Sequence, residues 1–213
     1  MEEFFTINNN TTAEIVEKKS QFIANLFFVK NKEMAENLIK ETKKKYHDAR
    51  HNCIAYRILT DNTIIEKSSD DGEPSGTAGA PMLDIIRKYS LCNVLIIVTR
   101  YFGGILLGTG GLVRAYSSAT IKAIEGAEKI YMCKGYEMQI EIDYNNLEVF
   151  KYYCKKNNIQ ITNITYLDVV ICNIELEKHI KEKIIDDINK KEIKINNVKV
   201  LCEKYINKKT ISM

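Results

Sequence analysis

Residues 99–119 read TRYFGGILLGTGGLVRAYSSA, and this stretch decides how the first part of the chain is expected to fold. It follows the apolar run VLIIV at 94–98, which is typical of a buried central strand. It ends in small and apolar residues at helical spacing. Between the two lie five of the ten glycines: Gly103, Gly104, Gly108, Gly110 and Gly111. The order strand, glycine loop, helix therefore predicts an α/β unit around this segment.

The glycine loop admits two roles. It can direct backbone N–H groups and a helix N-terminus at an anion, but tight turns and close packing of a helix on a strand also require glycine. The Walker pattern and the GxGxxG dinucleotide fingerprint are both missing. The sequence is compatible with both roles. The candidate binding residues are Arg100, Tyr101, Gly103, Gly104, Gly108, Thr109, Gly110, Gly111 and Arg114.

Composition limits the classes of protein that this chain can represent. The 213 residues are 45% hydrophobic, which is enough for one large or two small cores, and the net charge is only +3. Six cysteines form no CxxC pair, so neither a zinc knuckle nor a redox motif is indicated. The start MEEFFTINNN does not resemble a signal peptide, and no apolar run approaches membrane-spanning length. We expect a cytoplasmic protein without a membrane partner.

Periodicity divides the chain into an N-terminal domain over 1–133 and a C-terminal domain over 136–207. In the first, it predicts strands at 21–29 and 94–99, a hairpin of 52–59 and 63–68 around Asp61-Asn62, and helices at 31–46, 81–89 and after the glycine loop, the last ending at Gly126. Pro81 is expected at a first helical position. In the second, strands at 136–144, 159–167, 169–176 and 193–206 and helices at 145–156 and 177–189 give the ferredoxin-like order βαββαβ.

The stretch SDDGEPSGTAG at 69–79 is the second dense motif. Asp70, Asp71 and Glu73 could hold Mg²⁺ opposite an anion on the glycine loop. Alternatively, the stretch makes turns, and the carboxylates pair with Arg100, Arg114 or backbone N–H groups. We favour the second interpretation, expect neither a metal nor a cofactor, and expect the acidic and glycine loops to line one cleft.

The stretch HDARHNC at 47–53 is the third. His51 could serve proton transfer or contact a phosphate. A nucleophilic pair of Cys53 with His51 is conceivable, and local hydrogen bonding at a helix end is the alternative. Basic and aromatic side chains could also form a surface for single-stranded RNA, unless the aromatic rings lie in the core. The residues of that surface are Lys18, Lys19, Arg50, Arg57, Tyr101 and Phe102 with the two arginines of the glycine loop.

Four motifs in this order resemble the YigZ/IMPACT family: KSQFIA at 19–24, HDARHNC at 47–53, DDGEPSGTAG at 70–79 and RYFGGILLG at 100–108. The resemblance implies an α+β protein. Its first domain would be the α/β two-layer kind shared with a ribosomal protein, elongation factor G and GHMP-type kinases. Its second would be ferredoxin-like and similar to a domain of elongation factor G. The resemblance also implies a role near translation, and no enzymatic activity is securely attached to the family.

These observations lead to three functional hypotheses. We expect a translation-associated regulatory protein that binds RNA or the ribosome and is not an enzyme. The alternative is a Mg²⁺-dependent enzyme that binds a nucleotide or phosphate ligand at the glycine loop, with His51 available for proton transfer. The third hypothesis is an adaptor that binds a translation-related protein partner.

Overall fold

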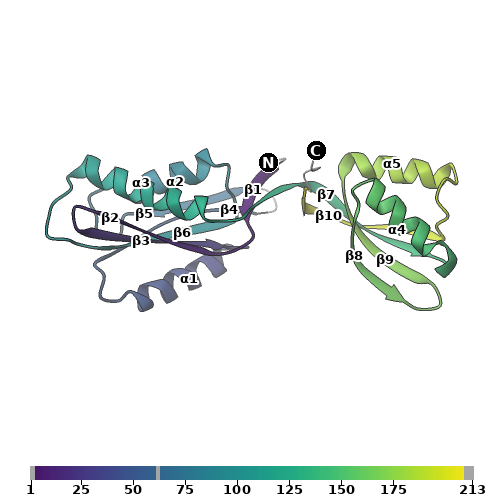
Figure 1. Ribbon diagram of the computed structural model, residues 1–213, viewed down its shortest axis with the longest axis horizontal. Coiled ribbons are helices and arrows are strands. Elements are labelled where there is room, and N and C mark those ends of the chain that lie inside the picture. The colour runs from purple at the N-terminus through teal and green to yellow at the C-terminus, as the bar shows by residue number, and fades with distance from the viewer. Residues whose placement is uncertain (1–2, 61–62, 209–213) are drawn as a thin grey trace. The chain divides into compact units, whose positions relative to one another are not determined.

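The computed structural model describes residues 3–60 and 63–208, and it divides into two compact units (Figure 1). One unit spans Phe4–Ile130, and the other runs from Tyr131 to the end of the described chain and includes Glu3. Each unit has its own hydrophobic core. The turn predicted at Asp61-Asn62 lies outside the described residues, although the two strands that flank it pair as expected.

The first unit is built on an antiparallel sheet of order β2-β3-β6-β4-β5. The strands are β2 Thr11–Glu17, β3 Ser20–Phe28, β4 His51–Leu59, β5 Ile64–Ser69 and β6 Val94–Tyr101. A further short strand, β1 Glu3–Ile7, precedes them; it pairs with β7 rather than with this sheet and forms a parallel bridge from Phe5 to Leu91. The central position predicted for the VLIIV strand is confirmed, because β6 pairs on both sides and is buried over Val94–Arg100.

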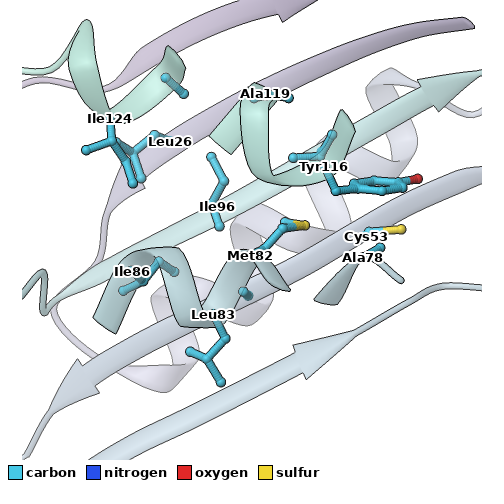
Figure 2. Close-up of a cluster of buried hydrophobic side chains, with 14 of the residues drawn as sticks. Leu26, Cys53, Ala78, Met82, Leu83, Ile86, Ile96, Tyr116, Ala119 and Ile124 are labelled. Carbon is cyan, nitrogen blue, oxygen red and sulfur yellow. The ribbon is translucent and has the colours of Figure 1, made fainter. Parts of the chain in front are cut away.

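Helices cover both faces of this sheet (Figure 1). Helices α2 Gly79–Lys88 and α3 Thr109–Glu125 pack on one face, where Met82 and Tyr116 belong to the same buried cluster as Leu26 and Ile96 of the sheet (Figure 2). Helix α1 Lys32–Lys45 covers the other face of the sheet. The unit thus has a second helical layer besides the one layer of helices and one sheet that were expected. Asn31 caps α1 as predicted, since its side chain accepts a hydrogen bond from the Met34 amide.

Two local expectations for the first unit were wrong or incomplete. Helix α2 begins at Gly79, two residues before Pro81, because the Asp70 carboxylate accepts the amides of Ala78 and Gly79 and so caps the helix from another element. Pro81 therefore occupies the third helical position, where an amide would have no intrahelical acceptor in any case. Strands β1 and β2 have no counterpart in the predictions.

The second unit has the predicted order βαββαβ and confirms the ferredoxin-like expectation. Strands β10 and β9 flank β7, and β8 pairs with β9, all antiparallel. Side chains of β7 and β9 pack against Phe150 of α4 and Ile184 of α5. The last strand begins four residues later than predicted. The elements are β7 Lys129–Ile142, η1 Tyr144–Asn146, α4 Leu147–Lys156, β8 Gln160–Tyr166, β9 Val170–Glu177, α5 Lys178–Asn189 and β10 Asn197–Asn207.

Candidate functional site

A pocket of about 450 Å³ in the first unit brings the glycine loop and the acidic loop together. The expectation that these two loops line one cleft is confirmed. We call it the glycine-loop pocket. Its lining residues are Arg50, His51, Gly72, Glu73, Pro74, Arg100, Phe102, Leu106, Leu107, Gly108, Thr109 and Leu112.

Arg100 and Glu73 form a buried ion pair at the floor of the glycine-loop pocket. Arg100 comes near the end of β6, and its Nη1 donates to Glu73 Oε1 at 2.7 Å. The two side chains are only 7% and 3% exposed, so neither charge is solvated by bulk water. The guanidinium carbon also lies 5.4 Å from the centroid of the Phe22 ring and 5.6 Å from that of Phe102. Glu73 is thus a counter-ion of Arg100.

A second buried donor holds Glu73. The Tyr116 hydroxyl donates to the same Oε1 at 2.8 Å, and the Tyr116 ring meets Phe22 edge to face at 5.2 Å. Burial, with Cys53 and Glu73 nearby, raises the pKa of Tyr116 above its usual value. Burial likewise raises the pKa of the Cys53 thiol to about 12. Its Sγ donates to the Asp70 carbonyl, so Cys53 is not an activated nucleophile.

The two aspartates of the acidic loop are also engaged with the protein. Asp70 accepts the amides of Gly76, Ala78 and Gly79; burial opposes ionisation of Asp70, but these backbone donors still lower its pKa. Asp71 accepts the Asn52 amide at 2.8 Å and pairs with Lys43 at 2.6 Å.

The prediction that these carboxylates pair with Arg100 and with backbone amides is therefore confirmed. The predicted pairing with Arg114 is wrong, because none of the three carboxylates contacts Arg114. Within the residues that the structure describes, no three side chains of His, Cys, Asp or Glu gather as metal ligands. The three carboxylates have separate partners, so they do not form the oxygen cage that a Mg²⁺ site would need.

His51 lies at the edge of the pocket, directly across the β4–β6 pairing from Arg100. Its Nδ1 lies 3.0 Å from the Asp71 carbonyl oxygen. A carbonyl only accepts, so Nδ1 carries the proton, and Nε2 is the ring nitrogen left for a ligand.

Helix α3 begins at the pocket. Its N-cap is Gly108, with φ 73°, and no side chain caps the first turn. The first amides of a helix have no intrahelical acceptors, so the amides after Gly108 can donate to a ligand. Gly108 itself has open space where a side chain would stand. Thr109 and Leu112 complete this side of the pocket.

The structure separates the predicted site residues into two groups. His51, Glu73, Arg100, Gly108 and Thr109 line the glycine-loop pocket, whereas the other candidates do not. Tyr101 donates its hydroxyl to Asp48 instead. Arg114 lies in a separate hollow beside Lys18. The remaining candidates outside the lining are Asp70, Asp71, Gly103, Gly104, Gly110 and Gly111.

The apolar wall of the pocket was not predicted from the sequence. Pro74, Leu106, Leu107 and Leu112 form it together with Phe102. Leu106 is 82% exposed. Ile105 is also exposed, whereas Leu107 packs against the core. The apolar run ILL between glycines is the sequence signal that could have indicated a binding surface.

Comparisons with known proteins agree with the two-unit fold. Residues 18–124 match the family model of the Impact N-terminal domain, and residues 140–191 match a domain of unknown function, DUF1949. IMPACT family member YvyE of Bacillus subtilis (strain 168) is 37% identical over 180 residues, which are 84% of this chain and 81% of that protein. IMPACT family member YigZ of Escherichia coli (strain K12) is 33% identical over 160 residues, 75% of this chain and 78% of that protein.

A solved structure described as a hypothetical protein superposes on this chain with a TM-score of 0.60 at 28% sequence identity. The superposition covers 92% of this chain and 97% of the chain in that structure. None of the helices described here is both long enough and apolar enough to cross a membrane.

Proposed function

Since the chain belongs to the IMPACT family, we propose that it is a cytoplasmic, translation-associated regulatory protein that binds RNA, alone or in the ribosome, through the glycine-loop pocket. The observation that carries this proposal is the combination of basic side chains, a helix N-terminus and an exposed aromatic ring in one pocket. Basic side chains and a helix N-terminus both favour the binding of phosphates, and unpaired bases stack on aromatic rings.

The charge of the pocket supports a phosphate partner. Glu73 neutralises one arginine, Arg100, and the exposed Arg50 adds a positive charge that no described acid balances by an ion pair. The exposed Arg114 lies on α3 beside Gly110, one helical turn from the pocket.

The sheet of the second unit is less suitable for RNA on the face that carries Glu137, Glu175 and Lys204. Glu137 of β7 and Glu175 of β9 both pair with Lys204 of β10, each at 2.7 Å. These two carboxylates and one lysine together carry one net negative charge, which repels phosphate. The first unit is therefore the better candidate for the RNA contact.

The enzyme alternative has less support. Asp70, Asp71 and Glu73 each have protein partners, and burial of Cys53 opposes formation of its thiolate. The adaptor alternative is favoured by one observation, the exposure of Phe102, Ile105 and Leu106 in a single loop. The experiment below separates it from RNA binding.

The test is co-sedimentation of the purified protein with ribosomes and with RNA, with and without nuclease, at two salt concentrations. The variant Arg50→Ala/Arg114→Ala removes two exposed positive charges and leaves the buried Arg100–Glu73 pair intact. The matched control is Lys40→Ala/Lys44→Ala, which removes two exposed charges from α1 on the opposite face of the sheet (Figure 1).

We expect the wild type and the α1 control to sediment with RNA, and the arginine variant to lose about tenfold or more in affinity. Binding should weaken as salt rises and disappear after nuclease treatment. Equal loss in both double variants, or binding that resists nuclease, would contradict the proposal, and the second result would favour the adaptor.

A further inference from the structure

We infer that the glycine-loop pocket is a site for one phosphorylated nucleotide, with its phosphate at the N-terminus of α3 and its base against the apolar wall. This inference rests on the proposed function and specifies the chemistry of the ligand. The same chemistry could come from a 5′-phosphorylated RNA end or from a free nucleotide, and the experiment below distinguishes them.

The phosphate end is defined by α3. This helix has 17 residues, no side-chain cap, and glycine at its N-cap, so its first amides are open to a ligand. A helix N-terminus carries a partial positive charge that favours a phosphate, and a phosphomonoester with nearly two charges gains more than a diester with one. A terminal phosphate is therefore the better partner for this position.

Arg100 gives an independent indication of a ligand. Its side chain is 93% buried and lines the pocket, yet its Nε has no hydrogen-bond partner among the described residues. Buried donors in native structures are almost always satisfied, so an unpaired one calls for a partner such as a ligand, an ion or a bound water. The guanidinium is held by Glu73 and by Ser20 Oγ at 3.4 Å, so its position beneath the pocket is fixed. Arg50 and His51 Nε2 provide further contacts at the rim.

The other wall fits a flat, largely apolar group. Phe102 has Arg100 5.6 Å from its ring centroid and is 50% exposed, so part of its ring is open to a ligand. Pro74, Leu107 and Leu112 lie around the same space. An arginine beside an exposed ring strengthens base stacking.

The size of the pocket limits the ligand. A volume of about 450 Å³ falls in the usual range of small-molecule sites, roughly 300–1,000 Å³. It suits a single nucleotide unit rather than a stretch of strand. Longer RNA would continue from this unit across the exposed surface.

The test is isothermal titration of the full chain with adenosine 5′-monophosphate, adenosine and inorganic phosphate. Thr109→Glu is the diagnostic variant, because Thr109 is exposed at the first position of α3 and lines the pocket. An acid there suits the helix, so the fold is kept, but it competes with the phosphate. Thr109→Gln is the variant of equal size, and Ser118→Glu adds the same charge farther along α3 at an exposed position outside this pocket.

We expect the monophosphate to bind about tenfold or more tightly than adenosine or phosphate alone. Thr109→Glu should weaken it by about tenfold, Ser118→Glu by less than about twofold, and Thr109→Gln by clearly less than Thr109→Glu. Equal binding of adenosine and its monophosphate, absence of binding, or equal effects of the two glutamates would overturn the inference.

Failure of this inference is distinguishable from failure of the proposed function. If RNA still sediments with the protein while the monophosphate does not bind, the inference is wrong and the proposed function stands. If the monophosphate binds and neither RNA nor ribosomes do, the pocket assignment stands and the proposed function is wrong. A 5′-phosphorylated oligonucleotide that binds better than its 5′-hydroxyl form identifies an RNA end, and equal weak binding of both identifies a free nucleotide.

Discussion

At the residue scale, the central feature is a buried charge pair rather than a surface patch. Arg100 was a candidate phosphate contact and Glu73 a candidate metal ligand, but each has the other as its nearest charged partner. Burying both charges is costly, and their mutual attraction repays the cost only while both are present. The pair therefore keeps Arg100 in a fixed position at the pocket.

The first prediction concerns this pair. Arg100→Met leaves the Glu73 carboxylate buried, with Tyr116 as its one remaining side-chain donor among the described residues, and should lower the free energy of unfolding by about 3–5 kcal/mol. The double variant Arg100→Met/Glu73→Leu should recover much of that loss, because no buried charge remains. Urea unfolding followed by circular dichroism measures both. A single variant that costs less than about 1 kcal/mol would show that the pair is solvated.

At the element scale, the glycine loop holds two kinds of glycine. A side chain at Gly103 would overlap the backbone of Lys19 and Ser20, and its amide donates to Ser20 Oγ at 3.1 Å. A side chain at Gly110 would meet only the end of the Arg114 side chain, 3.7 Å away. Close packing therefore explains Gly103. The N-terminus of α3 is open at Gly108 and Gly110, where contact with an anion stays a prediction.

The second prediction uses this difference. Gly103→Ala should lower the free energy of unfolding by about 1–3 kcal/mol, because the loop must move away from the β2–β3 turn. Gly110→Ala should leave stability unchanged or raise it by up to about 1 kcal/mol, since alanine favours a helix. Thermal unfolding of the two variants side by side provides the measurement. Similar destabilisation by both would mean that the whole loop is tightly packed.

At the scale of the whole molecule, the chain contains separate cores. Met82 belongs to the core of the first unit and Phe150 to that of the second, and both are buried. Strand β7 begins in one unit and continues into the other. Proteins with several cores often depart from two-state unfolding.

The third prediction is that calorimetry resolves two unfolding transitions. Phe150→Ala should lower the midpoint of one transition and Met82→Ala that of the other, because each truncation costs about 2–5 kcal/mol in its own core. Either variant lowering both midpoints equally would show that the two units unfold together.

Local sequence patterns were enough to predict the helices and strands whose hydrophobic residues recur at a clear period. Asn31 before an amphipathic segment predicted α1, the VLIIV run predicted the central strand, and the alternation of helices and strands after 136 predicted the ferredoxin-like unit. These patterns succeed because they record, within a few residues, which face of an element is buried. Strand β2 escaped prediction because it has no fully buried side chain and takes its place in the sheet by pairing with β3.

The sequence by itself also determined that the acidic and glycine motifs are special, and the expectation that they share one cleft was correct. Only the tertiary structure decided how each motif residue is used. Asp70 caps α2 and Glu73 neutralises Arg100. Pro74 of the acidic motif joins Leu106, Leu107 and Leu112 of the glycine-loop segment in one apolar wall. The physical reason is that a charged side chain pairs with whichever partner the fold places within hydrogen-bonding distance. The partners of Glu73 lie 27 and 43 residues away along the chain, at Arg100 and Tyr116, so no local pattern could identify them.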